Sequence, residues 1–149
     1  MRQGKARHLA TPRTLVFLRR GNRALLLEGG PKKWFAGLLN GVGGSVEPGE
    51  DVMSAALREC VEETGLRPAA LDLAAVIHVE ADPVVMLFVF VGDAPDGATR
   101  ASDEGELVWM HVDELHGAGK RLVPDLVDLL PRVLARRAGD PPMFLATRP

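Results

Sequence analysis

The sequence GSVEPGEDVMSAALRECVEETGL, residues 44–66, joins a glycine-rich loop to an acidic segment. Asp51 is a residue type that caps the N-terminus of a helix, and Gly65 is the type that follows a C-terminus, so we expect a helix over 51–64. Apolar residues at i, i+3, i+4, i+7 and i+8 predict one buried stripe on this helix: Met53, Ala56, Leu57, Cys60 and Val61. The helix should therefore pack against a core along that stripe.

Three glutamates lie beside the predicted stripe. Each helical residue advances by about 100°, so Glu59, Glu62 and Glu63 project from one side of the helix. Like charges at i+3 and i+4 destabilise a helix by roughly 0.2–0.5 kcal/mol for each pair. Mg²⁺ prefers oxygen ligands and would relieve this repulsion. A solvated acidic helix face is the alternative interpretation of the triplet taken alone.

The residues around the triplet favour a metal site. Glycines at positions 41, 43 and 44 let backbone carbonyls and amides approach an ion or a phosphate closely. Glu50 is predicted to pair with Arg58 and so to hold the loop against the helix. Arg58 can also orient Glu62, which lies one turn further along. The loop and the helix are therefore expected to act together.

Taken together, these positions form a recognisable pattern. Residues 44–66 fit G-x5-E-x7-R-E-U-x-E-E-x-G-U, where U is apolar, with the fixed positions Gly44, Glu50, Arg58, Glu59, Cys60, Glu62, Glu63, Gly65 and Leu66. This pattern resembles the Nudix box at every fixed position. The resemblance implies an α/β fold, the Nudix-type α/β/α sandwich, with a mixed β-sheet and the box as a loop-helix-loop. It also implies an enzyme that hydrolyses a diphosphate bond in a nucleotide derivative.

The remaining sequence predicts elements in an order compatible with this fold. Apolar runs, turn residues and periodicity predict a hairpin of 14–18 and 23–27, strands at 41–46, 71–79, 83–91 and 106–112, and a second helix over 124–137 with a kink or an end at Pro131. The helix should bury Leu126, Leu129, Leu130, Val133 and Leu134. We expect a flexible tail over 1–11, a Nudix domain over 12–138 and a C-terminal tail over 139–149, in which 143–145 can form an edge strand.

The resemblance also implies a metal site and catalytic roles. The carbonyl of Gly43 would bind Mg²⁺, or Mn²⁺ in its place, together with Glu59, Glu62 and Glu63 of the helix. Glu59 is the residue that relatives most often use to orient or deprotonate the water. Arg58 and Glu50 complete the expected catalytic set. Relatives often add a carboxylate from a loop near the last strand, and Glu104 matches best, with an acidic turn as the alternative.

Four further residues are candidates for substrate binding. Asn40 matches an asparagine that contacts the base in hydrolases of oxidised purine nucleotides, and Asp125 lies near a purine-reading carboxylate of one branch. Trp34 falls where some relatives place an aromatic ring on the purine, and Lys33 could attract phosphates. The alternatives are a turn residue for Asn40, a helix N-cap for Asp125, a half-buried loop anchor for Trp34 and a solvated lysine for Lys33.

The chain is closest in pattern to the MutT-like branch, which acts on 8-oxo-dGTP and other nucleoside triphosphates. One departure is Ser45, because many relatives carry lysine directly after the paired glycines, where it contacts a phosphate. The alternatives are a hydrolase of ADP-ribose or dinucleoside polyphosphates and a non-catalytic module that senses a nucleotide. Complete box glutamates favour an enzyme over the sensing module.

Composition and net charge limit the classes of partner that the chain is expected to bind. The 149 residues carry a net charge of −2, with 46% hydrophobic and 26% charged residues, which is typical of one globular domain and does not indicate nucleic-acid or membrane binding. The single cysteine, Cys60, excludes an internal disulfide and is expected in the core rather than as a nucleophile. The expected partner is a small nucleotide, with a homodimer left open, and the expected location is the cytoplasm. The four histidines show no metal-ligand spacing.

Overall fold

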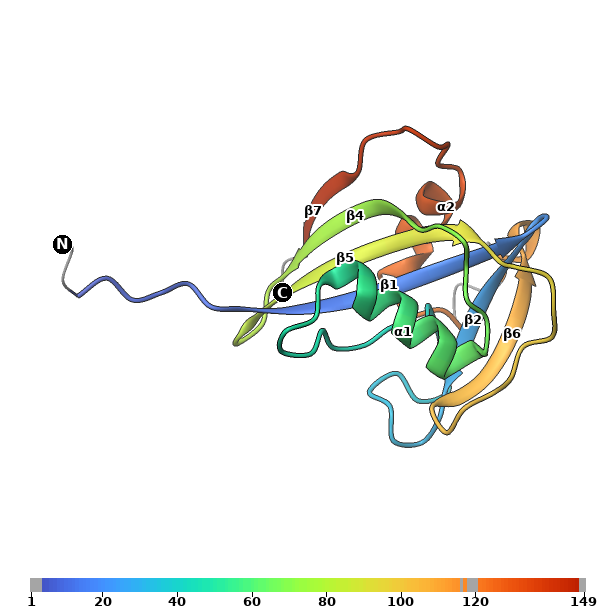
Figure 1. The fold of residues 1–149 in the computed structure, drawn as a ribbon, viewed down its shortest axis with the longest axis horizontal. Helices are drawn as coiled ribbons and strands as arrows, with labels where there is room; N and C mark the ends of the chain where they lie inside the picture. The colour runs from blue at the N-terminus through green and yellow to red at the C-terminus, as the bar shows by residue number, and fades with distance from the viewer. Residues whose placement is uncertain (1–3, 116, 118–120, 148–149) are drawn as a thin grey trace.

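A mixed seven-stranded sheet lies between two helices in the computed structural model, which describes residues 4–115, 117 and 121–147 (Figure 1). Its strands are β1 (Ala10–Arg20), β2 (Arg23–Gly29), β3 (Leu39–Asn40), β4 (Asp72–Val79), β5 (Val84–Asp93), β6 (Gly105–His111) and β7 (Met143–Thr147). The helices are α1 (Val52–Thr64) and α2 (Leu126–Leu134), and a short 3-10 turn covers Val112–Glu114. In Figure 1, α1 crosses in front of the sheet and α2 lies behind it, so the predicted α/β/α sandwich is confirmed.

The sheet is mixed because it contains both parallel and antiparallel strand pairs. It runs β3-β2-β1-β5-β4-β7, with β6 also paired to β2. β1 lies parallel to β5 and antiparallel to β2, while β4 lies antiparallel to β5 and parallel to β7. The central strand β1 buries the run from Leu15 to Leu18, because one helix covers each face of the sheet. This apolar centre positions the loops that carry the polar residues.

The predicted hairpin is present, and its strands are longer than expected. Arg20 pairs with Arg23 across a tight turn in which Gly21 adopts a φ of 58°. Positive φ is accessible to glycine without steric cost, which suits the turn. β1 begins at Ala10, before the expected domain start at residue 12, because its first residues pair with β5 from Ala10 opposite Val84 onwards. At the other end of the sheet, β7 pairs with β4 as an edge strand.

Both predicted caps of α1 are confirmed. The Asp51 carboxylate accepts a hydrogen bond from the Ser54 amide at 2.8 Å, and Gly65 follows the helix with a φ of 75° and donates to the Val61 carbonyl at 2.9 Å. The predicted stripe was partly wrong, since Met53 is 37% exposed. The face that is buried instead carries small residues and the end of the glutamate triplet: Ala55, Ala56, Cys60, Glu63 and Thr64. Small side chains allow the helix to approach the sheet closely on that side.

Two predicted elements differ from the structure. The strand expected over 41–46 is absent, and this segment forms only isolated bridges, Val42 to Val16 and Ser45 to Arg13, after the short β3. Its backbone runs so close to β1 that a Cβ at Gly43 would lie 2.0 Å from the Thr14 carbonyl oxygen. The second helix is shorter than 124–137. It continues through Pro131 and buries the predicted face except for the half-buried Leu134.

The end of α2 is held by a side chain from the sheet. Arg19 on β1 donates hydrogen bonds to the carbonyls of Leu134 at 3.2 Å and Arg136 at 3.3 Å. These contacts satisfy carbonyl groups that have no partner within the helix. No helix in the described residues is long and apolar enough to cross a bilayer.

Candidate active site

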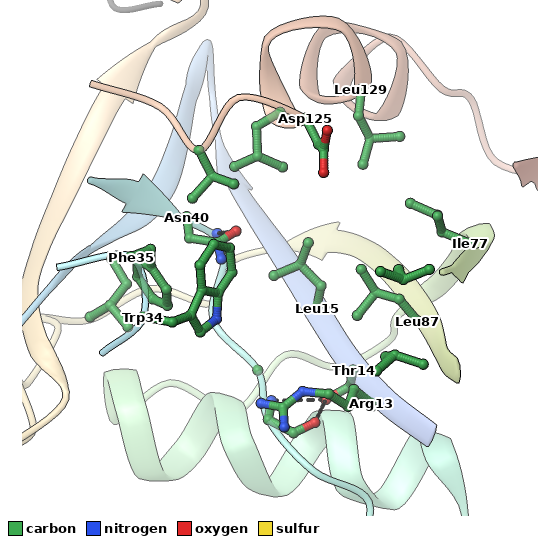
Figure 2. A pocket seen from close by; sticks show the side chains of 18 of the residues that line it. Arg13, Thr14, Leu15, Trp34, Phe35, Asn40, Ile77, Leu87, Asp125 and Leu129 are labelled. Carbon is green, nitrogen blue, oxygen red and sulfur yellow. Dashed lines mark hydrogen bonds between the residues drawn. The ribbon is translucent and has the colours of Figure 1, made fainter. Parts of the chain in front are cut away.

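A cavity of about 320 Å³ opens between the sheet and α2 (Figure 2). Its walls are mainly apolar, from strands β1, β4 and β5 and from α2, and include Leu15, Ile77, Leu87 and Leu129. The polar groups lie at its ends. In Figure 2, Asn40 and Asp125 lie toward α2, and Arg13 lies toward α1. The cavity also reaches Gly43, Gly44 and Glu63, so one continuous space connects the glycine loop to the first residues of α2.

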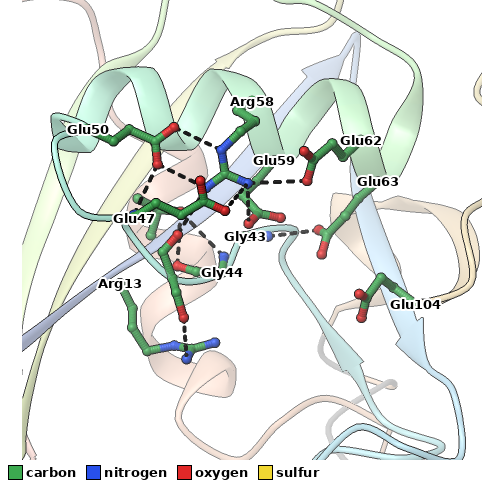
Figure 3. A network of polar contacts seen from close by, with 12 residues as sticks. Arg13, Gly43, Gly44, Glu47, Glu50, Arg58, Glu59, Glu62, Glu63 and Glu104 are labelled. Atoms are coloured by element: carbon green, nitrogen blue, oxygen red, sulfur yellow. Dashed lines mark hydrogen bonds and ion pairs between the residues drawn. The ribbon is translucent and has the colours of Figure 1, made fainter.

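Arg58 links the loop to the acidic helix (Figure 3). Its Nε and Nη2 donate to the two carboxylate oxygens of Glu50 at 2.8 and 2.9 Å, which confirms the predicted pairing. Its Nη1 donates to Glu59 at 3.0 Å and to Glu62 at 3.2 Å. Its Nη2 also donates to the Ser45 carbonyl at 3.1 Å. A bidentate arginine–carboxylate contact has a fixed geometry, so this residue orients the helix carboxylates relative to the loop.

Glu63 is the most deeply buried carboxylate of the triplet. Its side chain is 3% exposed, and its Oε2 accepts a hydrogen bond from the Gly43 amide at 2.9 Å. Burial raises the pKa of Glu63 to about 7, although the hydrogen bond from Gly43 acts in the opposite direction. Burial also raises the pKa of Glu59. The helix therefore presents two partly desolvated carboxylates to the glycine loop.

Gly44 lies directly against the carboxylate of Glu59. A Cβ at Gly44 would lie 2.6 Å from the Glu59 Oε1 atom, which is closer than real Cβ atoms come. The paired glycines thus leave room for β1 on one side, at Gly43, and for a helix carboxylate on the other, at Gly44. A larger residue at position 43 would clash with the backbone of β1, and one at position 44 would displace the Glu59 carboxylate.

The oxygen donors at this place suit a hard divalent ion. Glu63 is buried and Glu59 half-buried, and burial raises the pKa of both carboxyl groups. No hydrogen bond from a described residue reaches the Gly43 carbonyl. In the present arrangement, no three acidic, histidine or cysteine side chains of the described residues surround one point. The Arg58 Nη1 atom binds one oxygen of Glu59 and one of Glu62, so these two oxygens already have a cationic partner. Carboxylate and carbonyl oxygens are the ligands that Mg²⁺ prefers. An ion bound here would compete with Arg58 for the oxygens of Glu59 and Glu62.

Two of the predicted residues contact each other. The Lys33 ammonium forms an ion pair with Glu104, so the predicted phosphate-binding lysine and the predicted extra metal ligand neutralise one another. Figure 3 places Glu104 on the same side of the loop as Glu63. Lys33 also lines the cavity. The sequence could not show this pairing, because the two residues are far apart in the chain.

The other substrate candidates line the cavity. Asn40 is 8% exposed, and its Oδ1 accepts from the Gly41 amide at 2.8 Å, so it stabilises the turn as well as facing the cavity. Asp125 directly precedes α2, but its carboxylate makes no capping hydrogen bond. Trp34 is 75% exposed with its ring edge-on to Phe35, and the buried residue of that loop is Phe35. Asp125 therefore lies at the N-cap position, as the alternative had it, but without a capping side chain, and the alternative of a half-buried Trp34 is wrong.

The sequence analysis missed part of this cavity. Arg13 lines it from β1, and Ile77 and Leu87 line it from β4 and β5. Arg13 and Leu15 share one face of β1, because side chains alternate along a strand, so period-two alternation was the available signal. It was concealed because residues 15–18 are apolar without a break and the segment was interpreted only as one strand of a hairpin.

Comparisons with known proteins agree with this fold. The NUDIX domain family matches residues 9–133. Proteins named oxidized purine nucleoside triphosphate hydrolase, from Danio rerio and Mus musculus, are each 35% identical over 106 residues, which cover 68% of this chain and 67% of theirs. The crystal structure of a MutT protein from Methanosarcina mazei Go1 matches with a TM-score of 0.75 at 24% identity, over 88% of this chain and 97% of that one, which shows a common fold. The chain belongs to the Nudix family and is a Nudix hydrolase.

Proposed function

We propose that this Nudix hydrolase converts a purine nucleoside triphosphate, including oxidised purines, into the monophosphate and diphosphate with the aid of a divalent metal ion. The observation that carries the proposal is the single cavity that joins Asn40 and Asp125 to the glycine loop and Glu63. A base at one end and a phosphate chain at the other would fill such a space. The names of the similar proteins from Danio rerio and Mus musculus support the same substrate class.

The polar groups near α2 favour a guanine-type base. The Oδ1 atom of Asn40 is used by the Gly41 amide, so its side-chain NH₂ group is the donor left for a ligand. The Asp125 carboxylate offers acceptors and has no capping partner. Guanine carries an acceptor at O6 and a donor at N2, which complements a neighbouring donor and carboxylate. Trp34 can cover the base by stacking, since it is exposed at the cavity wall.

The residues of the Nudix box would supply the hydrolytic chemistry. The Gly43 carbonyl, Glu59, Glu62 and Glu63 are the proposed ligands of Mg²⁺ or Mn²⁺. Such an ion neutralises the diphosphate and lowers the pKa of bound water. Arg58 and Glu50 would hold the carboxylates in place, and Glu59 would orient the attacking water through its half-buried carboxylate. Glu104 is proposed as a further ligand, which requires it to leave Lys33.

A nucleotide panel tests the proposal. The purified chain is incubated with Mg²⁺ and 8-oxo-dGTP, dGTP, dATP, a pyrimidine triphosphate, ADP-ribose or a dinucleoside polyphosphate, and the products are separated by chromatography. We expect monophosphate and diphosphate from the purine triphosphates, fastest from a guanine-type base, and no turnover when the metal is removed with EDTA. Addition of Mg²⁺ or Mn²⁺ in excess should restore the rate.

Each other outcome has a distinct meaning. Preferred turnover of ADP-ribose or a dinucleoside polyphosphate would replace the proposed substrate with one of these classes. Release of single phosphate instead of diphosphate would show that a different bond is cleaved. Nucleotide binding without turnover of any compound would indicate a sensing module. As the place of action we propose the cytoplasm, which suits the single, unpaired Cys60.

A further inference from the structure

We propose that Arg13 binds the phosphate chain of the substrate and supplies the positive charge that the glycine loop lacks at Ser45. This proposal rests on the proposed function, because it names a specificity residue for the same site. Arg13 lies on β1, outside the Nudix box, and was not a candidate from the sequence. Its position, its charge and its place in the cavity support the assignment independently.

The backbone fixes Arg13 opposite the glycine loop. Arg13 and Ser45 form an antiparallel bridge, and next to it the Thr14 amide donates to the Gly44 carbonyl at 2.9 Å. The Arg13 Nη1 atom donates to the Ser45 hydroxyl at 3.2 Å (Figure 3). The guanidinium is therefore held directly over the residue that follows the paired glycines. Arg13 can therefore supply positive charge at this place without a lysine at position 45.

The charge of Arg13 has no acidic partner among the described residues. The other two cations near the loop are engaged, Lys33 with Glu104 and Arg58 with Glu50, whereas none of the ion pairs of the described residues includes Arg13. Its one side-chain partner, the Ser45 hydroxyl, is neutral. A guanidinium is planar and offers several N–H donors that match phosphate oxygens in pairs. An uncompensated arginine on a cavity wall is well suited to an anionic ligand.

The location of Arg13 selects the phosphates rather than the base. It lines the cavity beside Gly43, Gly44 and Glu63, whereas Asn40 and Asp125 lie toward the opposite end (Figure 2). A nucleotide whose base contacts Asn40 and Asp125 extends its phosphates toward the glycine loop. Arg13 therefore faces the part of the substrate in which a triphosphate differs from a monophosphate. Its removal should affect triphosphates more than monophosphates.

The test compares R13Q with wild type on a triphosphate and a monophosphate. Loss of a charge-assisted contact predicts a roughly 10- to 100-fold lower kcat/KM for the triphosphate, mostly through KM, and a smaller change in inhibition by the monophosphate product. Binding of a methylene-bridged, non-hydrolysable dGTP analogue is measured separately by calorimetry and should weaken by a similar factor. R67Q is the matched control, since Arg67 is exposed and lies outside the cavity.

A second variant restores the positive charge at Ser45, the residue that Arg13 contacts. Lysine introduced at Ser45 in the R13Q background should recover most of the lost affinity for the analogue, while Arg13→Lys should retain part of it. Thermal unfolding checks that each variant is folded. Equal affinity of R13Q and wild type for the analogue would overturn the assignment, as would an equal loss for triphosphate and monophosphate. Absence of turnover by the wild type would contradict the proposed function alone, because analogue binding is measured without turnover.

Discussion

Glu63 differs from its neighbours Glu59 and Glu62 in being buried and held by a backbone amide, that of Gly43. Replacement of Glu63 by glutamine keeps an acceptor for this amide and removes the charge. We expect E63Q to lower kcat by about 100-fold or more, because a metal ion loses a charged ligand. The rate of diphosphate release with excess Mg²⁺ measures the effect. A variant with wild-type activity would remove Glu63 from the metal site.

Stability provides the control for this variant. Removal from water costs a charged carboxylate more free energy than it costs a neutral amide. Without metal, E63Q should therefore unfold at a temperature no lower than that of the wild type. Added Mg²⁺ should raise the unfolding temperature of the wild type more than that of E63Q, since only the wild type retains the full set of ligands. A large loss of stability without metal would indicate that the fold itself depends on the charged carboxylate.

At the residue scale, the sequence revealed contacts that follow from short spacing and opposite charge. The pairing of Glu50 with Arg58 was predictable because Glu50 lies just before the helix and Arg58 lies within it, eight residues further along the chain. The pairing of Lys33 with Glu104 was not predictable, because it requires two loops to meet at β2 and β6. The contact of Arg13 with Ser45 was not predictable either, since it lies across a bridge between distant segments.

At the element scale, the N-terminus of α1 depends on Asp51. Its carboxylate accepts from the Ser54 amide and hydroxyl, and these hydrogen bonds lower the pKa of Asp51, with the backbone bond as the largest cause. Asp51→Ala should lower the melting temperature by a few degrees, because the first helical amides lose their acceptor. Asp51→Asn keeps an acceptor and should lose less. Differential scanning calorimetry at neutral pH measures both.

The same cap predicts a dependence on pH. A carboxyl group whose folded pKa is lowered stabilises the protein above its unfolded pKa and loses that contribution as pH falls through the folded pKa. The advantage of wild type over D51N should therefore shrink as pH falls below about 4, the ordinary pKa of aspartate. A gap between the two proteins that stays constant down to acid pH would show that the charge of Asp51 does not stabilise the helix.

The elements that the sequence predicted well have strong local signals. The caps of α1, the turn at Gly21 and the apolar face of α2 depend on residues close together in the chain. The strand expected over 41–46 failed, because close approach to β1, rather than strand pairing, determines the glycine loop. The buried face of α1 was misplaced because apolar residues on several sides of the helix left its orientation to be decided by the sheet.

At the scale of the whole molecule, the single cysteine reports on the packing of α1 against the sheet. Cys60 is fully buried, and burial raises the pKa of its thiol to about 12. Its sulfur joins the core cluster that also contains Phe17 and Val91 from the central strands. A thiol reagent can reach it only when the helix separates from the sheet, so its reactivity measures the opening of the entire sandwich rather than of one loop.

We therefore expect the native chain to react with a thiol reagent such as DTNB far more slowly than the chain unfolded in guanidinium chloride. The reaction should accelerate with denaturant in step with global unfolding followed by circular dichroism, because one opening event exposes the single thiol. A bound nucleotide with Mg²⁺ should slow it further, since ligands that bind only the folded state oppose that opening. Rapid modification of the folded protein would contradict the packing of α1 against the sheet. Protection by the nucleotide that does not depend on Mg²⁺ would show that the substrate binds without the metal ion.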